Sequence, residues 1–317
     1  VVGMQGSFDS LNPFIVRGVA PQHVRGLVVQ SLMARSLDEP FTVYPQVAAA
    51  VTLAPDGTSV TFHLDPAARF SDGERITSAD VRFSFETLKD KGRPDSRFRK
   101  VSEIATPDDV TISFALTDTT DRELPIIIAL TPVFQKSRTD GEKFEETTLK
   151  PISGSGPYVV GDVQPGQSFT LKRNPEYWAK DRPTSRGLYN FDEIRVDFYR
   201  DSNSLFEAFK AGLYDIRLED NPSLWASGYD FPAIRDGRIR RENLPLASAR
   251  GMTGFVLNTR RPQFGDVRVR EALALMFDFE WVNRNLFLGA YARLDSFFAG
   301  SDLSAAGRPA SEGERAF

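Results

Sequence analysis

Residues 194–218 carry the pattern that most limits how this chain can fold. Residues 194–199 alternate apolar and polar side chains, as expected of a half-buried strand. Ser202 then offers a helix N-cap, and Gly212 is typical of a left-handed helix terminator. Residues 214–218 predict a second strand. A strand–helix–strand unit of this kind predicts a parallel or mixed sheet with a right-handed crossover, and hence an α/β fold.

The chain is too long for one hydrophobic core. Its 317 residues suggest two domains, because single cores rarely grow beyond about 250–300 residues. The compositional style changes three times along the chain, near residues 45, 150 and 253. Residues 45–150 combine a hairpin, a helix and a strand, which predicts a small α+β subdomain. No repeat of constant period is present, so the styles indicate lobes or subdomains instead of a single barrel.

Several further elements follow from periodicity and turn chemistry. Residues 46–64 predict a β-hairpin around Asp56-Gly57, and the capping box at 77–80 predicts a helix that begins at Ser78. The remaining expected elements are a helix over 24–37, strands over 110–116, 169–171 and 255–257, a helix over 267–277 capped by Asp266, and a helix that follows Asp278.

Composition excludes several classes of protein. The chain has no cysteine and only two histidines, so disulfides, thiolate zinc sites and cysteine nucleophiles are excluded. The formal net charge of −4 provides no basic field for a nucleic acid. The longest apolar run, Leu124–Leu130, contains a proline and is far shorter than the ~18 residues of a membrane span. We therefore expect no cofactor, no nucleic-acid partner and no direct membrane insertion.

The candidates for catalysis are weak. The carboxylate pairs Asp38-Glu39 and Asp108-Asp109 can in principle share a proton or hold a metal, but both occur in turn sequences. Residues 154–156 read Gly-Ser-Gly without matching G-x-S-x-G, because Ser153 stands two places before Ser155. His63 falls on the polar face of its strand. These observations predict a protein that is not an enzyme.

Arginine clusters provide a second kind of candidate. Arginines at 235, 238, 240 and 241 have the forked geometry that suits carboxylates, including peptide C-termini. Such clusters more often pair with neighbouring acids on a solvated face. The abundant aromatic residues mostly predict packing, and a minority are available to line a ligand cleft.

An ordered series of motifs resembles one known family over almost the whole chain. The motifs resemble those of YejA-type extracellular solute-binding proteins, which belong to the oligopeptide- and dipeptide-binding proteins that serve ABC importers. The motifs are Gly6–Phe14, Ser36–Phe41, Leu53–Gly57, Val60–Phe62, Ala68–Gly73, Ala79–Val81, Gly154–Tyr158, Asn174–Trp178, Glu207–Gly212, Phe255–Asn258 and Asp266–Leu273.

The resemblance implies a periplasmic-binding-protein-like α/β fold of class II (cluster C), in which two lobes close on a ligand. Residues 1–44 and 151–252 would form the first lobe, and 45–150 the extra α+β subdomain. Residues 253–317 would cross the hinge and begin a second lobe that is incomplete here, because family members are considerably longer. From this we expect weak ligand affinity for residues 1–317 alone and an exposed apolar patch that favours association.

The resemblance also implies where the ligand binds. The loop formed by Leu37, Asp38, Glu39 and Pro40 lies where family members offer backbone partners to the ligand. Asn258 and Thr259 would sit at the hinge and cleft, and Asn12 and Tyr158 are lesser candidates. No catalytic residue and no metal ligand are implied.

The implied function is capture of oligopeptides or peptide conjugates in the periplasm for delivery to the permease subunits of an ABC transporter. The first residues show no signal peptide, as in a mature chain. Alternatives are the same fold with another cargo (a peptide–nucleotide antibiotic, an opine or a sugar), a peptidase, and a chaperone-like interaction module.

Overall fold

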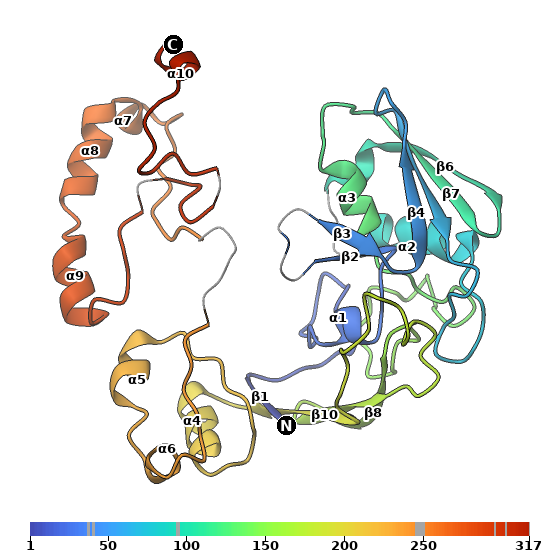
Figure 1. Ribbon diagram of the computed structural model, residues 1–317, viewed down its shortest axis with the longest axis horizontal. Coiled ribbons are helices and arrows are strands. Elements are labelled where there is room, and N and C mark those ends of the chain that lie inside the picture. The colour runs from blue at the N-terminus through green and yellow to red at the C-terminus, as the bar shows by residue number, and fades with distance from the viewer. Residues whose placement is uncertain are drawn as a thin grey trace. The chain divides into compact units, whose positions relative to one another are not determined.

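The computed structural model describes residues 1–36, 39, 42–92, 96–244, 251–294, 296–301 and 303–316. It divides the chain into two compact units, Val1–Arg217 and Leu218–Phe317 (Figure 1). Each unit has its own pattern of elements: among the residues just named, all strands fall in the first unit, and the second is built from short helices.

A four-stranded mixed sheet lies at the base of the first unit. Its strands run in the order β1-β10-β9-β8, with β1 parallel to β10 and the other pairs antiparallel. Phe169, Leu171 and Val196 are buried on one face of this sheet. The strands are β1 (Val2–Gln5), β8 (Tyr158–Gln164), β9 (Ser168–Arg173) and β10 (Glu193–Tyr199).

The strand–helix–strand unit is only partly as predicted. Helix α4 (Ser202–Lys210) follows β10, and its N-cap is Asp201, whose carboxylate accepts from the amide of Ser204. Gly212 adopts φ +74° after the helix, as expected of a terminator. The strand predicted over 214–218 is wrong: Ile216 forms a single parallel bridge to Val2. Tyr214 packs against Gly3 instead, since a Cβ on Gly3 would lie 2.7 Å from the Tyr214 ring.

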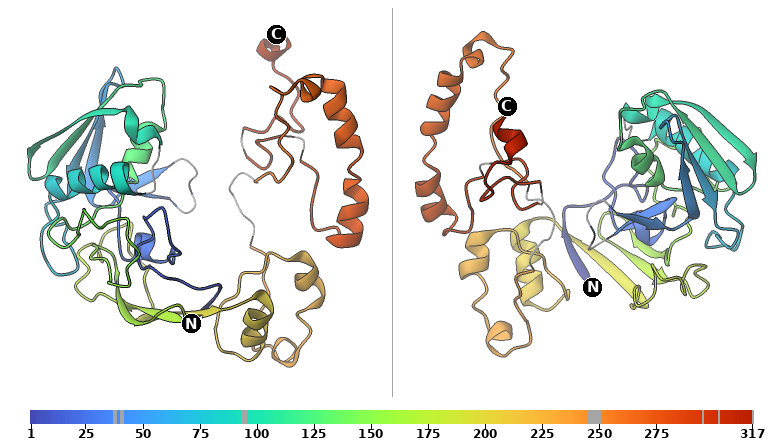
Figure 2. Two further views of the ribbon diagram at one scale, coloured as in Figure 1. Left: turned by 180° about the vertical axis from the view of Figure 1, so that it is seen from behind. Right: turned by 45° about the horizontal axis from the view of Figure 1, so that its top comes forward.

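The second sheet belongs to the segment expected to form an α+β subdomain. Its strands run in the order β4-β5-β7-β6, all antiparallel, and α2 (Ser78–Lys91) packs against β6 and β7 (Figure 2). The predicted hairpin and helix are confirmed, and the Thr77–Asp80 capping box is present. The other elements are β4 (Ala48–Leu53), β5 (Ser59–Leu64), η1 (Ser96–Lys100), β6 (Val101–Asp108), β7 (Thr111–Leu116) and α3 (Leu124–Ala129).

The helix predicted over 24–37 is wrong. Only α1 (Val24–Leu27) forms, and within it Arg25 is extended and Gly26 adopts φ +76°, which ends helical geometry after a few residues. The chain then enters β2 (Met33–Arg35), which pairs with β3 (Val43–Pro45) as a separate two-stranded sheet. Leu32 and Met33 are buried, so the apolar spacing that resembles a helix serves the core through an irregular backbone.

The Gly154-Ser155-Gly156 motif is a point of close backbone approach. A Cβ on Gly154 would lie 1.9 Å from the carbonyl oxygen of Val28, and one on Gly156 would lie 2.2 Å from that of Leu27. The Gly156 amide donates to the Val28 carbonyl at 2.9 Å. Any larger side chain at position 154 or 156 would clash with the backbone of residues 27 and 28. The two glycines are therefore required for packing.

The second unit confirms two predicted helix caps and contradicts one strand. Asp266 and Asp278 cap α8 and α9 through their carboxylates. The strand expected over 255–257 is wrong: the segment is irregular, and Phe255 is 94% exposed. A strand needs a neighbouring edge, and the described residues of this unit form no sheet. The helices are α5 (Pro222–Ser227), α6 (Pro232–Arg235), α7 (Pro262–Gly265), α8 (Val267–Leu275), α9 (Phe279–Leu286) and α10 (Glu312–Arg315).

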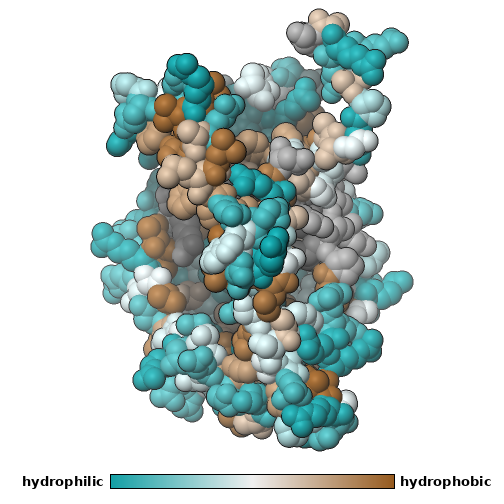
Figure 3. Space-filling view, turned by 90° about the vertical axis from the view of Figure 1, so that its left-hand side faces the viewer, coloured by the Kyte–Doolittle hydropathy of each residue, from teal (hydrophilic) through white to brown (hydrophobic). Residues whose placement is uncertain are grey.

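Large apolar side chains are exposed along α8 and α9. Leu275 is 85%, Met276 82% and Trp281 55% exposed. Figure 3 shows brown, apolar side chains scattered among teal ones on the face that it presents. These side chains are exposed one by one, so the expected apolar patch and association through it both stay predictions. Among the described residues, no helix is both long and apolar enough to span a bilayer.

We expect Gly154→Ala to destabilise the first unit by about 2–3 kcal/mol, because the added methyl group must displace the backbone of Val28. Urea unfolding followed by circular dichroism measures the effect. Gly254→Ala is the matched control, since nothing lies within 4 Å of a Cβ at that position. Equal stabilities of the two variants would contradict the packing role of Gly154.

Candidate functional site

The loop predicted to meet the ligand connects β2 and β3. The hairpin pairs Ala34 with Tyr44 and Arg35 with Val43. Two backbone bonds close the loop, from the Ser36 amide to the Thr42 carbonyl at 3.0 Å and from the Thr42 amide to the Glu39 carbonyl at 3.3 Å. Of the four predicted loop residues, Leu37, Asp38 and Pro40 lie outside the described residues, and Glu39 lies within them.

Glu39 is exposed and held from two sides. Its amide donates to the Ser36 hydroxyl at 3.0 Å, and the phenol of Tyr44 donates to Oε2 of Glu39 at 2.6 Å. Its other carboxylate oxygen accepts no hydrogen bond from any residue that the structure describes. The loop therefore presents a positioned carboxylate oxygen that can accept from an ammonium or amide donor.

Asn12 is buried and serves its own loop. Oδ1 accepts from the amide of Phe14 at 3.0 Å, and Nδ2 donates to the carbonyl of Phe144 at 3.4 Å. Its backbone amide donates to the Ser10 hydroxyl at 3.1 Å. The side chain of Asn12 therefore stabilises a turn, and the geometry provides no support for contact with a ligand.

Tyr158 begins β8 and is 1% exposed. Its phenol donates to the carbonyl of Phe191 at 2.8 Å, and its ring meets that of Tyr189 edge-on at 6.3 Å. Burial raises the pKa of the Tyr158 phenol. The Tyr158 side chain anchors the 174–191 segment. Ligand binding by Tyr158 stays a prediction, and its burial does not support it.

Asn258 and Thr259 belong to the second unit and are exposed. Oδ1 of Asn258 accepts from the amide of Arg260 at 3.1 Å and from its Nε at 3.2 Å. The carbonyl of Asn258 accepts from the Arg261 amide at 3.0 Å, which makes a turn before α7. The first unit contains the other three described candidates: Asn12, Glu39 and Tyr158. Among the described residues, none of these three side chains is hydrogen-bonded to another of them.

Of the groups considered for catalysis, Asp108 has a structural partner. Oδ1 of Asp108 accepts from the Val110 amide at 2.8 Å, and this bond lowers the pKa of the Asp108 carboxyl. His63 is exposed on β5, as predicted, and burial lowers the pKa of His23. Within the described ranges, no group of three His, Cys, Asp or Glu side chains could hold a metal ion.

The arginine cluster is also structural. Arg235, Arg238 and Arg240 pair with neighbouring acids: Asp230, Asp236 and Glu242. Arg241 stacks over the rings of Trp225 and Tyr229 at 4.2 and 5.3 Å. The solvated-face interpretation therefore describes this cluster better than ligand binding does.

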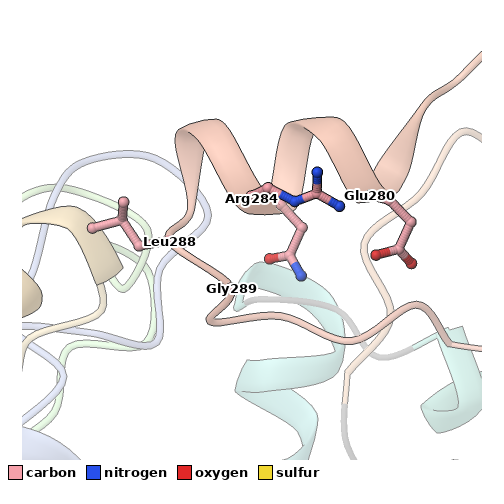
Figure 4. A pocket seen from close by; sticks show the side chains of 5 residues that line it. Glu280, Arg284, Leu288 and Gly289 are labelled. Atoms are coloured by element: carbon pink, nitrogen blue, oxygen red, sulfur yellow. The ribbon is translucent and has the colours of Figure 1, made fainter.

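Two hollows were not predicted from the sequence. One, of about 420 Å³, lies beside α9 and is lined by Glu280, Asn283, Arg284, Leu288 and Gly289 (Figure 4). The amide of Asn283 is engaged there, with Nδ2 donating to the Tyr291 carbonyl at 2.7 Å and Oδ1 accepting from its amide at 3.1 Å. The other is a polar groove on β8, β9 and β10. Its only sequence signal is the alternation that leaves polar side chains on one face of those strands.

A family model and several known proteins match this chain. The model described as bacterial extracellular solute-binding proteins, family 5, middle, matches residues 42–314. A Brucella suis relative is 47% identical over 99% of this chain and 53% of its own length. In Agrobacterium fabrum, the peptidoglycan-binding protein YepA is 40% identical over 99% of this chain and 54% of its own. The chain spans about half the length of the curated relatives it matches.

Further comparisons concern a second relative and the fold. A probable peptide-binding protein, YejA of Agrobacterium fabrum, is 36% identical over 96% of this chain and 51% of its own. The structure of NikA from Brucella suis with Fe(III)-EDTA matches 98% of this chain and 60% of its own, with a TM-score of 0.75 and 20% identity. DppA from Helicobacter pylori in complex with the peptide STSA matches 91% of this chain and 58% of its own, with a TM-score of 0.65 and 18% identity. The expected two-lobe α/β fold class is confirmed.

We expect alkaline destabilisation from the tyrosines around Tyr158. Burial raises the pKa of Tyr189 from 10.0 to about 12, so folding favours its neutral phenol. This stabilisation is complete below pH 10 and is lost as the pH rises towards 12. Thermal melts between these pH values, with phenolate absorbance followed in parallel, measure the loss.

Tyr189→Phe should reduce this alkaline loss, whereas Tyr291→Phe, at an exposed position of the second unit, should leave it unchanged. The same decline of melting temperature with pH in wild type and Tyr189→Phe would contradict the assignment.

Proposed function

Because this chain belongs to the bacterial extracellular solute-binding proteins of family 5, we propose that it is the peptide-binding part of an ABC importer's substrate-binding protein. The cargo is an oligopeptide or a peptide conjugate, held without bond cleavage. The protein works in the periplasm and delivers its cargo to membrane permease subunits.

One observation carries this choice of cargo. The chain is 36–40% identical, over 96–99% of its length, to relatives named for binding peptide and peptidoglycan. Both names describe ligands that contain peptide chains. A smaller solute of the opine type is the second candidate, favoured by 26% identity over 68% of this chain to AgaA, whose structure holds agropinic acid.

The β2–β3 hairpin supports a peptide ligand on physical grounds. The two strands pair only with each other among the described residues, so each keeps an edge whose backbone groups can bond an extended chain. Glu39 adds a positioned carboxylate beside that edge. A peptide offers the amide and ammonium donors that such an edge and carboxylate accept.

The positions of the histidines and of the carboxylate pair argue against a peptidase. The described histidines lie apart on different elements, one before α1 and one on β5, and the carboxylate pair at Asp108 caps a turn. A nucleophile with a base within reach is what hydrolysis requires. We therefore propose a binding role without turnover.

We expect Tyr44→Phe to weaken peptide binding by about fivefold, the effect of losing one hydrogen bond of about 1 kcal/mol that holds the Glu39 carboxylate. The measurement is an NMR titration of the 317-residue chain with trialanine, which detects millimolar affinity. Mass spectrometry of the recovered peptide tests for turnover.

Tyr291→Phe serves as the control, because its ring packs on Phe287 in the second unit. Three results would overturn the proposal: no perturbation of residues 33–45 at millimolar trialanine, cleavage of the peptide, or tighter binding of an opine than of any peptide.

A further inference from the structure

The polar groove on the first unit lies on the outer face of the sheet, opposite the buried Phe169 and Val196. Its volume is about 590 Å³, within the range of about 300–1,000 Å³ typical of small-ligand sites. Its lining belongs to β8, β9, β10 and their connecting turn, and includes none of the residues proposed for peptide binding. The lining residues are Asp162, Gln164, Gln167, Ser168, Thr170, Glu193, Arg195, Asp197, Phe198 and Tyr199.

The hollow has a backbone cause. The pairing of β8 with β9 shifts register between Val160 and Val163, which is a bulge. Gly161 lies in this bulge, and a Cβ there would lie 2.6 Å from the hydroxyl of Thr170. The amide of Asp162 donates to that hydroxyl at 2.8 Å, which holds the bulge in place. The concavity therefore belongs to the sheet itself, and no side-chain rotation is needed to open it.

Two ion pairs compensate two of the three carboxylates that line the groove. Lys172 Nζ lies 3.0 Å from Oδ2 of Asp162, and Arg195 Nε lies 2.8 Å from Oδ1 of Asp197. Glu193 interacts electrostatically with both cations. A cationic ligand would have to compete with Lys172 and Arg195 for these acids, and an anionic ligand would meet three carboxylates. A neutral ligand avoids both of these costs.

The groove also holds polar groups that the protein leaves without partners. Among the described residues, the side chains of Gln164, Gln167, Ser168 and Tyr199 form no hydrogen bond with one another or with other protein groups. Together they offer amide and hydroxyl groups that both donate and accept. The Asp197–Arg195 pair places a carboxylate acceptor beside a guanidinium donor, which matches two neighbouring hydroxyls of one ligand.

An aromatic ring borders the groove. Tyr199 is half-buried and packs on Tyr214, with ring centroids 5.9 Å apart. A ring held this way offers an apolar surface to the C–H face of a flat, polar ligand. We propose that this groove binds a neutral saccharide of one or two rings, at a site separate from the one proposed for peptides.

The test is an NMR titration of the whole 317-residue chain with maltose, cellobiose and N,N′-diacetylchitobiose. We expect at least one disaccharide to shift the side-chain amide signals of Gln164 and Gln167, with a dissociation constant on the order of millimolar. Spermidine and citrate serve as charged probes and should bind this groove more weakly.

Arg195→Met should weaken disaccharide binding about tenfold, because a charged hydrogen-bond donor is lost. Arg173→Met is the matched control: Arg173 is also an arginine of this sheet paired with an aspartate, Asp192, but it lies outside the lining. Gln164→Ala is a second test variant should Arg195→Met unfold, as judged by circular dichroism.

The proposal is overturned if no disaccharide shifts the groove signals at about 50 mM, a concentration well above a millimolar dissociation constant. Equal losses in the Arg195 and Arg173 variants, or tighter binding of spermidine or citrate, would also overturn it. Trialanine binding is followed through the NMR signals of residues 33–45, which are different from those of the groove. A negative disaccharide titration therefore does not affect the peptide proposal, and a negative trialanine titration does not affect the saccharide proposal.

Discussion

The close backbone contact between residues 154–156 and 27–28 is the constraint on which the first unit depends. The Gly156 amide bonds the Val28 carbonyl at 2.9 Å, and the Gly154 carbonyl accepts from the Ser71 amide at 2.9 Å. The Ser155 carbonyl accepts from Nε1 of Trp178 at 3.2 Å. One tripeptide thus joins three distant stretches of chain through main-chain groups, and the missing glycine side chains make the distances possible.

An ion pair makes a second link between distant parts of the first unit. Arg182 pairs with the buried carboxylate of Asp65 at the end of β5 and stacks over Trp178 at 5.1 Å. Asp65 also accepts from the amide of Ala67 at 2.8 Å. This ion pair couples the 45–150 segment to the connection between β9 and β10, and removal of Arg182 would leave a buried carboxylate without its cation. The β2–β3 hairpin, which carries Glu39, follows directly after residues 27–30 and is positioned by this same junction.

The chemistry of the surface agrees with a binding role. Two histidines and no cysteine leave little material for catalysis, whereas the hairpin edge, Glu39 and the sheet groove offer acceptors and donors to a ligand. The relatives named for peptide and peptidoglycan share 36–40% of residues with this chain.

Features whose causes lie within a few residues could be predicted from the amino-acid sequence. These are the capping box at Thr77 and Asp80, the caps at Asp266 and Asp278, the hairpin around Asp56-Gly57 and the left-handed Gly212. The family was also evident from the ordered motifs. Tertiary contacts gave residues 24–36 a short helical turn and strand β2, limited 214–218 to a single bridge, and buried Asn12 and Tyr158. The reason is physical: caps and turns are completed by neighbouring residues, whereas strands, burial and the hollow at Gly161 depend on partners supplied from distant parts of the chain.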